Sequence, residues 1–461
     1  MTKRLSIVFF ALATVILAAC GGCKPNTPPD DPTQKEQADL SLIKQSVPVT
    51  NDWIYSGKPE ITLRIENPNK VAVKLETKVR ISTDQKVEVT ILTDSVEVAA
   101  NSTQDFVATT PDKLEPGFYR AVCFVNGKSA RSFVFGIDPF QIESKPDKQP
   151  DYDEFWQAAK DQLAAIDMHA NLIELPSKSS AKRKVYLVEL NSVPDGLTGD
   201  PVIVRGYYCE PQDGQKHPVI MHFYGYDTQG STSKVECPSG GSSDYAEFYL
   251  SHRGQYINNR PASSRVEDGL GDLENIYGDW FAYNFGDKNS YYYRGAFMDC
   301  VQAVRFMSTR ETSDMSRLFA EGSSQGGALT YAAAALSDFP FTAIAPNVAF
   351  LGDFPDYFKI VGWPAETAKA EAQKKGMTDE EMYIFLSYFD TKNLATRISS
   401  AVLASSGLQD GTCPPHTNIA PFNNLQTPQE KDKEYIFAPE MGHDYPSGWS
   451  NKMMNFFKER M

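Results

Sequence analysis

The chain has 461 residues, of which 41% are hydrophobic, and its formal net charge at pH 7 is −14. This length exceeds one ordinary domain, and the apolar fraction is enough for packed cores, so we expect two domains. The negative charge repels phosphate backbones and no stripe of lysine or arginine offsets it, which disfavours nucleic-acid binding. No Gly-rich phosphate loop, dinucleotide fingerprint or HExxH motif occurs, so we expect neither a cofactor nor a metal ion.

Residues 1–20 are predicted to be a lipoprotein signal peptide. Lys3 and Arg4 form a basic start, and the apolar stretch Leu5–Leu17 is short for a membrane span. The Leu-Ala-Ala-Cys sequence that follows resembles a bacterial lipoprotein cleavage box, which makes Cys20 the expected lipidated N-terminus. The alternative is an ordinary secretory peptide with an incidental cysteine. Residues 21–39 predict a flexible tether, and the whole segment predicts a bacterial cell-envelope lipoprotein facing the periplasm or the outside.

Residues 40–140 predict a small all-β unit of immunoglobulin-like sandwich type. Apolar residues alternate with polar ones around Ile61, Leu63 and Ile65, and Asn126-Gly127 is a strong hairpin signal between two further runs. A second hairpin is expected across residues 83–86, with Val79 and Ile81 matched by Val87 and Val89. Such a unit binds glycan or spaces the rest of the chain from its anchor, and the sequence favours the spacer because it shows no exposed aromatic platform.

The second predicted domain, residues 145–461, begins within a polar linker, Glu143–Asp151, and beyond this linker strands alternate with helices. Val185–Leu190 and Val202–Tyr208 predict an early antiparallel pair, and Val219–Tyr224 and Glu247–His252 predict central strands. A helix is expected over Met298–Met307. This order of elements predicts an α/β-hydrolase fold, a mostly parallel sheet flanked by helices.

The pentad at 322–326 is Gly-Ser-Ser-Gln-Gly, and it lies between an apolar strand and an alanine-rich helix. That setting is typical of a nucleophile elbow, in which a serine stands on a sharp strand-to-helix turn, so Ser324 is the candidate nucleophile. The partners expected after a nucleophile in these hydrolases, an acid and then a histidine, are present. Asp410 follows the strand-like run at 401–404, and His443 follows another at 434–438. Loops after parallel strands converge at one edge of a sheet, so the three residues can meet.

The chain has only 6 histidines, which makes the competing assignments few. His416 is the main rival base, but it follows Asp410 by only a few residues, and the orienting acid normally comes from a different loop. His222 lies within a strand and is interpreted as a packed residue. His252 ends another strand, and its neighbours attract more interest than its ring.

Six motifs in order resemble the signature of carbohydrate esterase family seven, the acetyl xylan esterases and cephalosporin C deacetylases. The motifs are Tyr224-Gly225-Tyr226, Arg253-Gly254-Gln255, Tyr291-Tyr292-Tyr293-Arg294, Gly322-Ser323-Ser324-Gln325-Gly326-Gly327, the run from Gly407 to Pro415, and His443. The opening at 150–156 also looks like the first helix of that family, so the resemblance covers about 145–461.

The resemblance implies roles for particular residues. Ser324 would be the nucleophile, His443 the general base and Asp410 its orienting acid, and the backbone N–H groups of Tyr226 and Gln325 would form the oxyanion hole. Arg253 and Gln255 match a family motif that supports the active site from behind, which implies a structural role.

The chain departs from the family pattern at three places. Asp444-Tyr445 follow His443 where the family usually has Glu-Gly. Ser323 stands where the family usually has glycine. Ala349 stands where we expect a proline that lines the acyl pocket, so pocket size and substrate are less well defined than the triad.

The function expected from these features is removal of O-acetyl groups from acetylated xylan or xylo-oligosaccharides by a lipid-anchored serine esterase. Rival functions are a lipase or long-chain esterase, a peptidase of the same fold, and an inactive glycan-binding surface lipoprotein. Members of the family are often ring-like oligomers, so a homo-oligomer is compatible with the resemblance. The 7 cysteines lack metal-ligand spacing. Two interpretations stand for Cys209 and Cys300: either one could form a disulfide in an oxidising compartment, or both are buried small hydrophobic residues.

Overall fold

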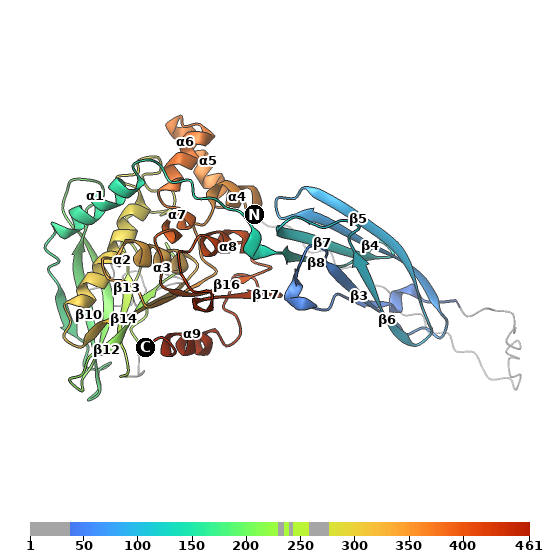
Figure 1. Cartoon of the computed structure of the whole chain (residues 1–461), viewed down its shortest axis with the longest axis horizontal. Coiled ribbons are helices and arrows are strands. Elements are labelled where there is room, and N and C mark those ends of the chain that lie inside the picture. Colours follow the sequence, from blue (N-terminus) through green and yellow to red (C-terminus); the bar gives the residue numbers. More distant parts are fainter. Residues whose placement is uncertain (1–36, 229–234, 239–242, 258–275) are drawn as a thin grey trace, which may run out of the picture.

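A computed structural model describes residues 37–228, 235–238, 243–257 and 276–461 of the chain. The predicted signal peptide with Cys20, and the tether up to residue 36, lie outside the described residues. Figure 1 shows an elongated molecule, with a β-rich unit at one end and a mixed α/β unit at the other. Within the described ranges, no helix combines the length and apolar character that a bilayer crossing requires.

The N-terminal unit is a sandwich of two sheets. One sheet has the order β1-β3-β6 and the other has the order β2-β8-β7-β4-β5. All pairs are antiparallel except the short parallel pair of β2 with β8. The strands are β1 (Lys44–Ser46), β2 (Ile54–Tyr55), β3 (Glu60–Asn67), β4 (Val73–Thr83), β5 (Glu88–Val98), β6 (Ser102–Thr109), β7 (Gly117–Val125) and β8 (Lys128–Ile137).

The predicted alternation of β3 is confirmed, because Ile61, Leu63 and Ile65 are all buried in the core. Asn126 and Gly127 both have positive φ, 45° and 73°, as the tight turn between β7 and β8 requires.

The expected valine pairing of the β4–β5 hairpin is wrong. A register shift after Ile81 places Val79 opposite Leu92, and Val87 and Val89 are 62% and 40% exposed. One extra residue in a strand moves its side chains to the other face, so the valines cannot face the core.

The C-terminal unit is built on a nine-stranded sheet with the order β17-β16-β15-β14-β12-β13-β11-β10-β9. Neighbours from β17 to β13 are parallel, and β11, β10 and β9 add an antiparallel edge. The strands are β9 (Asn171–Glu174), β10 (Arg183–Ser192), β11 (Val202–Pro211), β12 (His217–Phe223), β13 (Ala246–Ser251), β14 (Ser313–Ser323), β15 (Ala343–Asn347), β16 (Ala401–Gly407) and β17 (Lys433–Ala438). This is the predicted α/β-hydrolase architecture.

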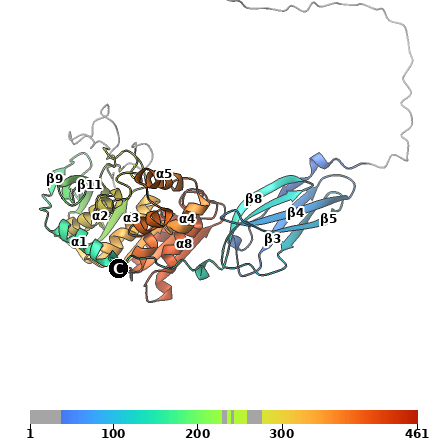
Figure 2. The same ribbon diagram turned by 90° about the horizontal axis from the view of Figure 1, so that it is seen from above.

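Helices cover both faces of this sheet. Helices α1, α2, α3, α7 and α8 pack in succession on one face, whereas α9 lies against the opposite face, as Figure 1 shows. The helices are α1 (Tyr152–Ala164), α2 (Tyr292–Ser308), α3 (Gln325–Leu336), α4 (Phe354–Ile360), α5 (Ala365–Lys375), α6 (Asp379–Ser387), α7 (Thr391–Ala395), α8 (Pro415–Asn423) and α9 (Trp449–Lys458). In both views α4 and α8 lie on the side that faces the sandwich (Figure 2).

The segment predicted as a linker lies against the α/β unit. The Ser144 hydroxyl donates to Asp353 over 2.7 Å, and the Asp147 backbone N–H donates to the Asn393 side chain over 3.0 Å. Helix α1 then begins at Tyr152. The connection between the two units is therefore anchored by hydrogen bonds.

Candidate active site

Ser324 occupies a sharp turn between strand β14 and helix α3. Its φ of 59° and ψ of −122° are unfavourable for a residue with a side chain, and such strain costs about 1–3 kcal/mol. The flanking glycines make the turn sterically feasible, because a Cβ on Gly322 would lie 2.3 Å from the Gly326 carbonyl oxygen. A Cβ on Gly326 would lie 2.3 Å from the Phe223 carbonyl oxygen. This geometry is that of the predicted nucleophile elbow.

The loop after β15 holds the elbow in its strained conformation. The Ser324 backbone N–H donates to the Asn347 carbonyl, and the Phe350 N–H donates to the Ser324 carbonyl, each over 3.0 Å. The Ser323 hydroxyl accepts a hydrogen bond of 2.9 Å from the Asn347 side chain. The serine that departs from the family pattern is therefore hydrogen-bonded within this network.

Asp410 and His443 come from the loops that follow β16 and β17, as predicted. The Nδ1 atom of His443 lies 2.7 Å from Oδ2 of Asp410. The other Asp410 oxygen accepts the backbone N–H groups of Thr412 and Cys413 at 2.8 and 2.9 Å. The Asp410 side chain is fully buried, whereas that of His443 is 30% exposed. A carboxylate so held fixes the ring with Nδ1–H toward the acid and Nε2 free to act as a base.

A cavity of about 670 Å³ brings Ser324, His443 and Tyr226 together. Phe350 and Trp363 form an apolar part of its wall, with their rings stacked at 5.4 Å between centroids. The other lining residues are His222, Phe223, Tyr224, Gly225, Tyr249, Glu321, Ser323, Thr412 and Tyr445. Asp410 is buried behind His443.

Of the two predicted oxyanion-hole residues, Tyr226 lines this cavity and Gln325 is a buried residue directly after Ser324. Gln325 is the first residue of α3, so its backbone N–H has no partner within the helix. Its side chain is turned away, donating to His252 Nε2 over 2.9 Å and accepting from the Tyr293 hydroxyl over 2.8 Å. Burial lowers the pKa of His252 to about 4, so this ring is neutral and can accept the Gln325 amide. His252 is a supporting residue that sequence reasoning missed.

Arg253 and Gln255 lie behind the site, where the resemblance placed a supporting motif. Arg253 is buried, and its guanidinium contacts both oxygens of Asp299 at 2.8 and 2.9 Å. It also contacts Asp195 at 2.9 Å. Gln255 donates to the carbonyl of Gly225 over 3.1 Å, which fixes the residue before Tyr226. The motif therefore braces the loop that carries Tyr226, whose backbone N–H is one of the two predicted for the oxyanion hole.

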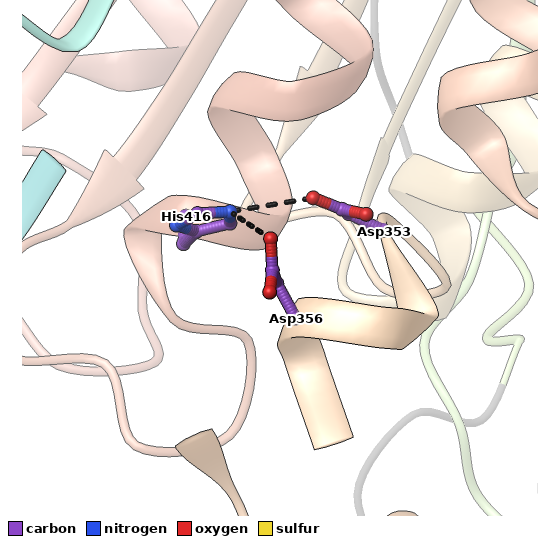
Figure 3. Close-up of side chains that lie close together, drawn as sticks. All are labelled: Asp353, Asp356 and His416. Carbon is purple, nitrogen blue, oxygen red and sulfur yellow. Dashed lines mark hydrogen bonds and ion pairs between the residues drawn. The ribbon is translucent and has the colours of Figure 1, made fainter. Parts of the chain in front are cut away.

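His416, the rival base, lies outside the cavity and among carboxylates. Figure 3 shows its ring directed toward Asp353 and Asp356, at 3.3 and 3.6 Å. Asp84 of the sandwich lies 3.5 Å from the other ring nitrogen. Hydrogen bonds to these carboxylates raise the pKa of His416 well above its usual range, against the opposing effect of burial, so the ring is an imidazolium.

The three ligand atoms of Asp353, Asp356 and His416 lie within 4.8 Å of one another, a spacing that a metal ion could span. Lys392 and Lys359 already contact the two carboxylates, each at 2.8 Å. Together with the charged His416, these cations balance the acidic groups, and the cluster is an ion-pair network.

The expectation for Ala349 is wrong. Its side chain is buried and contacts Gly327, where an added Cβ would lie 2.9 Å from the Ala349 Cβ. Phe350, the next residue, lines the cavity instead. The positive φ values of Val348 and Leu351, 38° and 64°, twist the loop, and alternation along the sequence could not predict which side chain faces inward.

His222 and Glu321 form a polar part of the cavity wall that the sequence did not predict. The His222 ring lies 2.7 Å from Glu321 and 3.3 Å from Glu247, and it stacks on Tyr249 at 4.1 Å. Hydrogen bonds to the two carboxylates raise the pKa of His222 to about 9 although burial alone would lower it. The ring is thus a cation with 12% of its side chain exposed. The hint in the sequence was its place near the end of a central strand.

The two cysteines considered for pairing are both buried thiols. The Cys300 thiol donates to the Ala296 carbonyl over 3.3 Å, and burial raises its pKa well above the usual range. Cys209 lies 2.8 Å from Arg183. They are therefore the small buried residues of the second interpretation.

The comparisons with known proteins agree with this geometry. The family model described as acetyl xylan esterase matches residues 140–460. The chain is similar to the acetyl esterase Axe7A of Xylanibacter ruminicola, with 23% identity over 344 residues, 74% of this chain and 73% of the relative.

Among solved structures, an acetyl xylan esterase from Paenibacillus sp. R4 superposes with a TM-score of 0.56 and 27% identity, covering 70% of this chain and 98% of that one. Acetyl xylan esterase 1 from Thermoanaerobacterium sp. has a TM-score of 0.50 and 24% identity, covering 68% of this chain and 95% of that one, and it supports the fold. Since the family model covers more than half of the chain, the protein is a carboxylic ester hydrolase that belongs to the acetyl xylan esterase family.

Proposed function

We propose that the protein removes O-acetyl groups from acetylated xylan or xylo-oligosaccharides through an acetyl-enzyme intermediate on Ser324. The observation that carries this proposal is the 2.7 Å contact between Asp410 and His443, with His443 and Ser324 lining one cavity. Membership of the acetyl xylan esterase family supports the choice of acetyl group and sugar.

The proposed mechanism follows from the placement of the groups. The Ser324 hydroxyl attacks the acetyl carbonyl carbon and its proton passes to Nε2 of His443, while Asp410 stabilises the resulting imidazolium. The backbone N–H groups of Tyr226 and Gln325 stabilise the oxyanion. Collapse of the intermediate returns the proton to the departing sugar hydroxyl. Water, deprotonated by His443, then releases acetate and restores Ser324.

The chemistry of the cavity wall supports a carbohydrate substrate over a long acyl chain. Phe350 and Trp363 provide apolar surface for a small acyl group. Glu321, His222 and the 51% exposed Tyr445 provide hydrogen-bonding groups on the same cavity, and such groups suit sugar hydroxyls. A long acyl chain bound here would exclude water from this charged wall without offering it any hydrogen bond, at a cost in binding free energy.

A substrate panel with one variant tests the proposal. Wild type should release acetate from acetylated xylo-oligosaccharides and turn over p-nitrophenyl octanoate and peptide anilides poorly. Glu321→Gln should lower kcat/KM on the sugar esters by about tenfold, the effect of one charge-assisted hydrogen bond. It should change p-nitrophenyl acetate hydrolysis less than about twofold, since that ester has no sugar. Faster octanoate or peptide cleavage by wild type would favour a rival enzyme, and no hydrolysis of any ester would favour the glycan-binding alternative.

We also propose that the protein is anchored in the bacterial cell envelope through a lipid on Cys20. The basic start, the short apolar stretch and the Leu-Ala-Ala-Cys sequence support this. Cys20→Ala should move the protein from the membrane fraction to the soluble fraction and abolish labelling by a palmitate analogue. A wild-type protein that takes up no lipid would contradict the anchor.

A further inference from the structure

The N-terminal sandwich contacts the loops that carry the acid and the base. We propose that the sandwich is a positioning element of the active site, and that Gln409 is the positioning residue through which it holds Asp410 and His443 in register. This inference rests on the proposed roles of Asp410 and His443. It assigns the sandwich a part in catalysis in place of the spacer role that the sequence favoured.

Gln409 joins three parts of the protein with one side-chain amide. Its Oε1 accepts the backbone N–H of Val134 at 2.9 Å, and its Nε2 donates to the Val134 carbonyl at 3.1 Å. The same Nε2 donates to the Pro439 carbonyl at 2.7 Å. Val134 belongs to the sandwich and Pro439 begins the loop that leads to His443, while Gln409 itself precedes Asp410.

The sandwich offers an open strand edge at this point. Strand β2 pairs with β8 only at Gly136 and Ile137, so the edge of β8 beside Val134 is not covered by β2. An amide side chain that bonds both N–H and C=O of one residue reproduces the pairing of a neighbouring strand. Gln409 thus pairs the N–H and C=O of Val134, and leaving these groups unpaired between the two domains would cost free energy.

The two catalytic loops are also tied to each other. The Gln409 backbone N–H donates to the Met441 carbonyl over 2.9 Å, and the Leu408 N–H donates to the Ala438 carbonyl over 3.0 Å. From the sandwich, Arg131 reaches Glu440 at 2.8 Å, and Phe118 lies 6.3 Å from Phe437 between ring centroids. A shift of β8 would therefore move both loops together.

A second contact holds the far end of the acid loop. Asp84 of the sandwich lies 3.5 Å from His416, which Figure 3 shows against Asp353 and Asp356 of the α/β unit. The neighbouring Gln85 donates to Asp356 over 3.1 Å. Gln409 and His416 lie on either side of Asp410 in the sequence, so the sandwich contacts the acid loop before and after the acid.

The region that matches the family model begins at residue 140, after the last strand of the sandwich. The contacts of Val134 and Arg131 therefore come from outside the matched region. Small displacements of catalytic groups reduce turnover strongly, by about a hundredfold for 1 Å. A domain that restrains both loops therefore acts on kcat more than on substrate binding.

Three substitutions in the full-length protein test the proposal with p-nitrophenyl acetate. Gln409→Leu removes all three side-chain bonds, and we expect kcat to fall about ten- to a hundredfold with KM within about twofold of wild type. Arg131→Met removes the link to Glu440 from the sandwich side, and kcat should fall about two- to fivefold. Arg64→Met removes an exposed ion pair with Asp105 inside the sandwich, away from the catalytic loops, and kcat should stay within about twofold.

Thermal unfolding and the rate at which a small fluorophosphonate modifies Ser324 accompany the kinetics. A positioning role lowers the modification rate in parallel with kcat in protein that is fully folded. A kcat for Gln409→Leu within about twofold of wild type, or a loss that matches only its unfolded fraction, overturns the proposal. If Gln409→Leu does not fold, Arg131→Met decides, and its unchanged kcat overturns the proposal. Wild type inactive on every acetyl ester would instead refute the proposed function.

Discussion

His222 is a largely buried cation in the cavity wall, and its replacement should change how the stability of the protein depends on pH. Its ring lies between Glu321 at 2.7 Å and Glu247 at 3.3 Å, and these contacts raise its pKa from 6.5 to about 9. The folded protein therefore keeps a proton on His222 over a pH range in which the unfolded chain has lost it.

The sign and size of the effect follow from this difference. Because the folded-state pKa is raised, the stabilisation is fully present below pH 6.5 and is lost as the pH rises through about 9. One extra proton in the folded state lowers the free energy of unfolding by about 1.4 kcal/mol for each pH unit. Between pH 6.5 and about 9 the total is about 3 kcal/mol.

The assay is urea unfolding at a series of pH values, for wild type and for His222→Gln. Groups that do not contact His222 titrate equally in both proteins, so the difference between the two free energies of unfolding reports His222 together with its partners Glu321 and Glu247. We expect wild type to lose about 3 kcal/mol more than the variant between pH 6.5 and about 9. Parallel curves over this range would refute the assignment of a buried imidazolium.

Two further predictions concern the elbow and the acyl wall. Gly326→Ala should lower the free energy of unfolding in urea by several kcal/mol, because the added Cβ would lie 2.3 Å from a backbone oxygen. Gly411→Ala is the control, and it should change this free energy little, because its added Cβ meets no atom within 4 Å. Equal stability of the two variants would contradict the crowded turn. Phe350→Ala should raise kcat/KM for p-nitrophenyl butyrate relative to acetate by about tenfold, since it enlarges the wall beside Ser324, and Ala349→Ser should leave that ratio unchanged. A larger effect at residue 349 than at residue 350 would restore the sequence-based interpretation of Ala349.

The sequence predicted the features that depend on local pattern. The strand-to-helix setting of Ser324 and the strand ends before Asp410 and His443 placed all three residues in the loops where the structure has them. Loops after parallel strands meet at one sheet edge whatever their separation along the chain, which is why this reasoning succeeded.

The features that failed depend on contacts between distant residues. A register shift in one hairpin exposed Val87 and Val89, and a twisted loop turned Phe350 rather than Ala349 into the cavity. The environment of His222 arises from two neighbouring strands, β13 and β14, so no periodicity in its own strand could indicate a charge. The bonds of Gln409 to the sandwich likewise join residues that only the domain arrangement brings together.

The central claim is that Ser324 is the nucleophile of an acetyl esterase acting on sugars. Acetate release from acetylated xylo-oligosaccharides by wild type and by Ser324→Ala tests it most directly. We predict that the variant unfolds at the same temperature as wild type and releases acetate more slowly by about four orders of magnitude or more, as loss of a triad nucleophile does. A folded Ser324→Ala protein that keeps more than about a tenth of the wild-type rate would contradict the account, because acetate release would then not depend on the Ser324 hydroxyl.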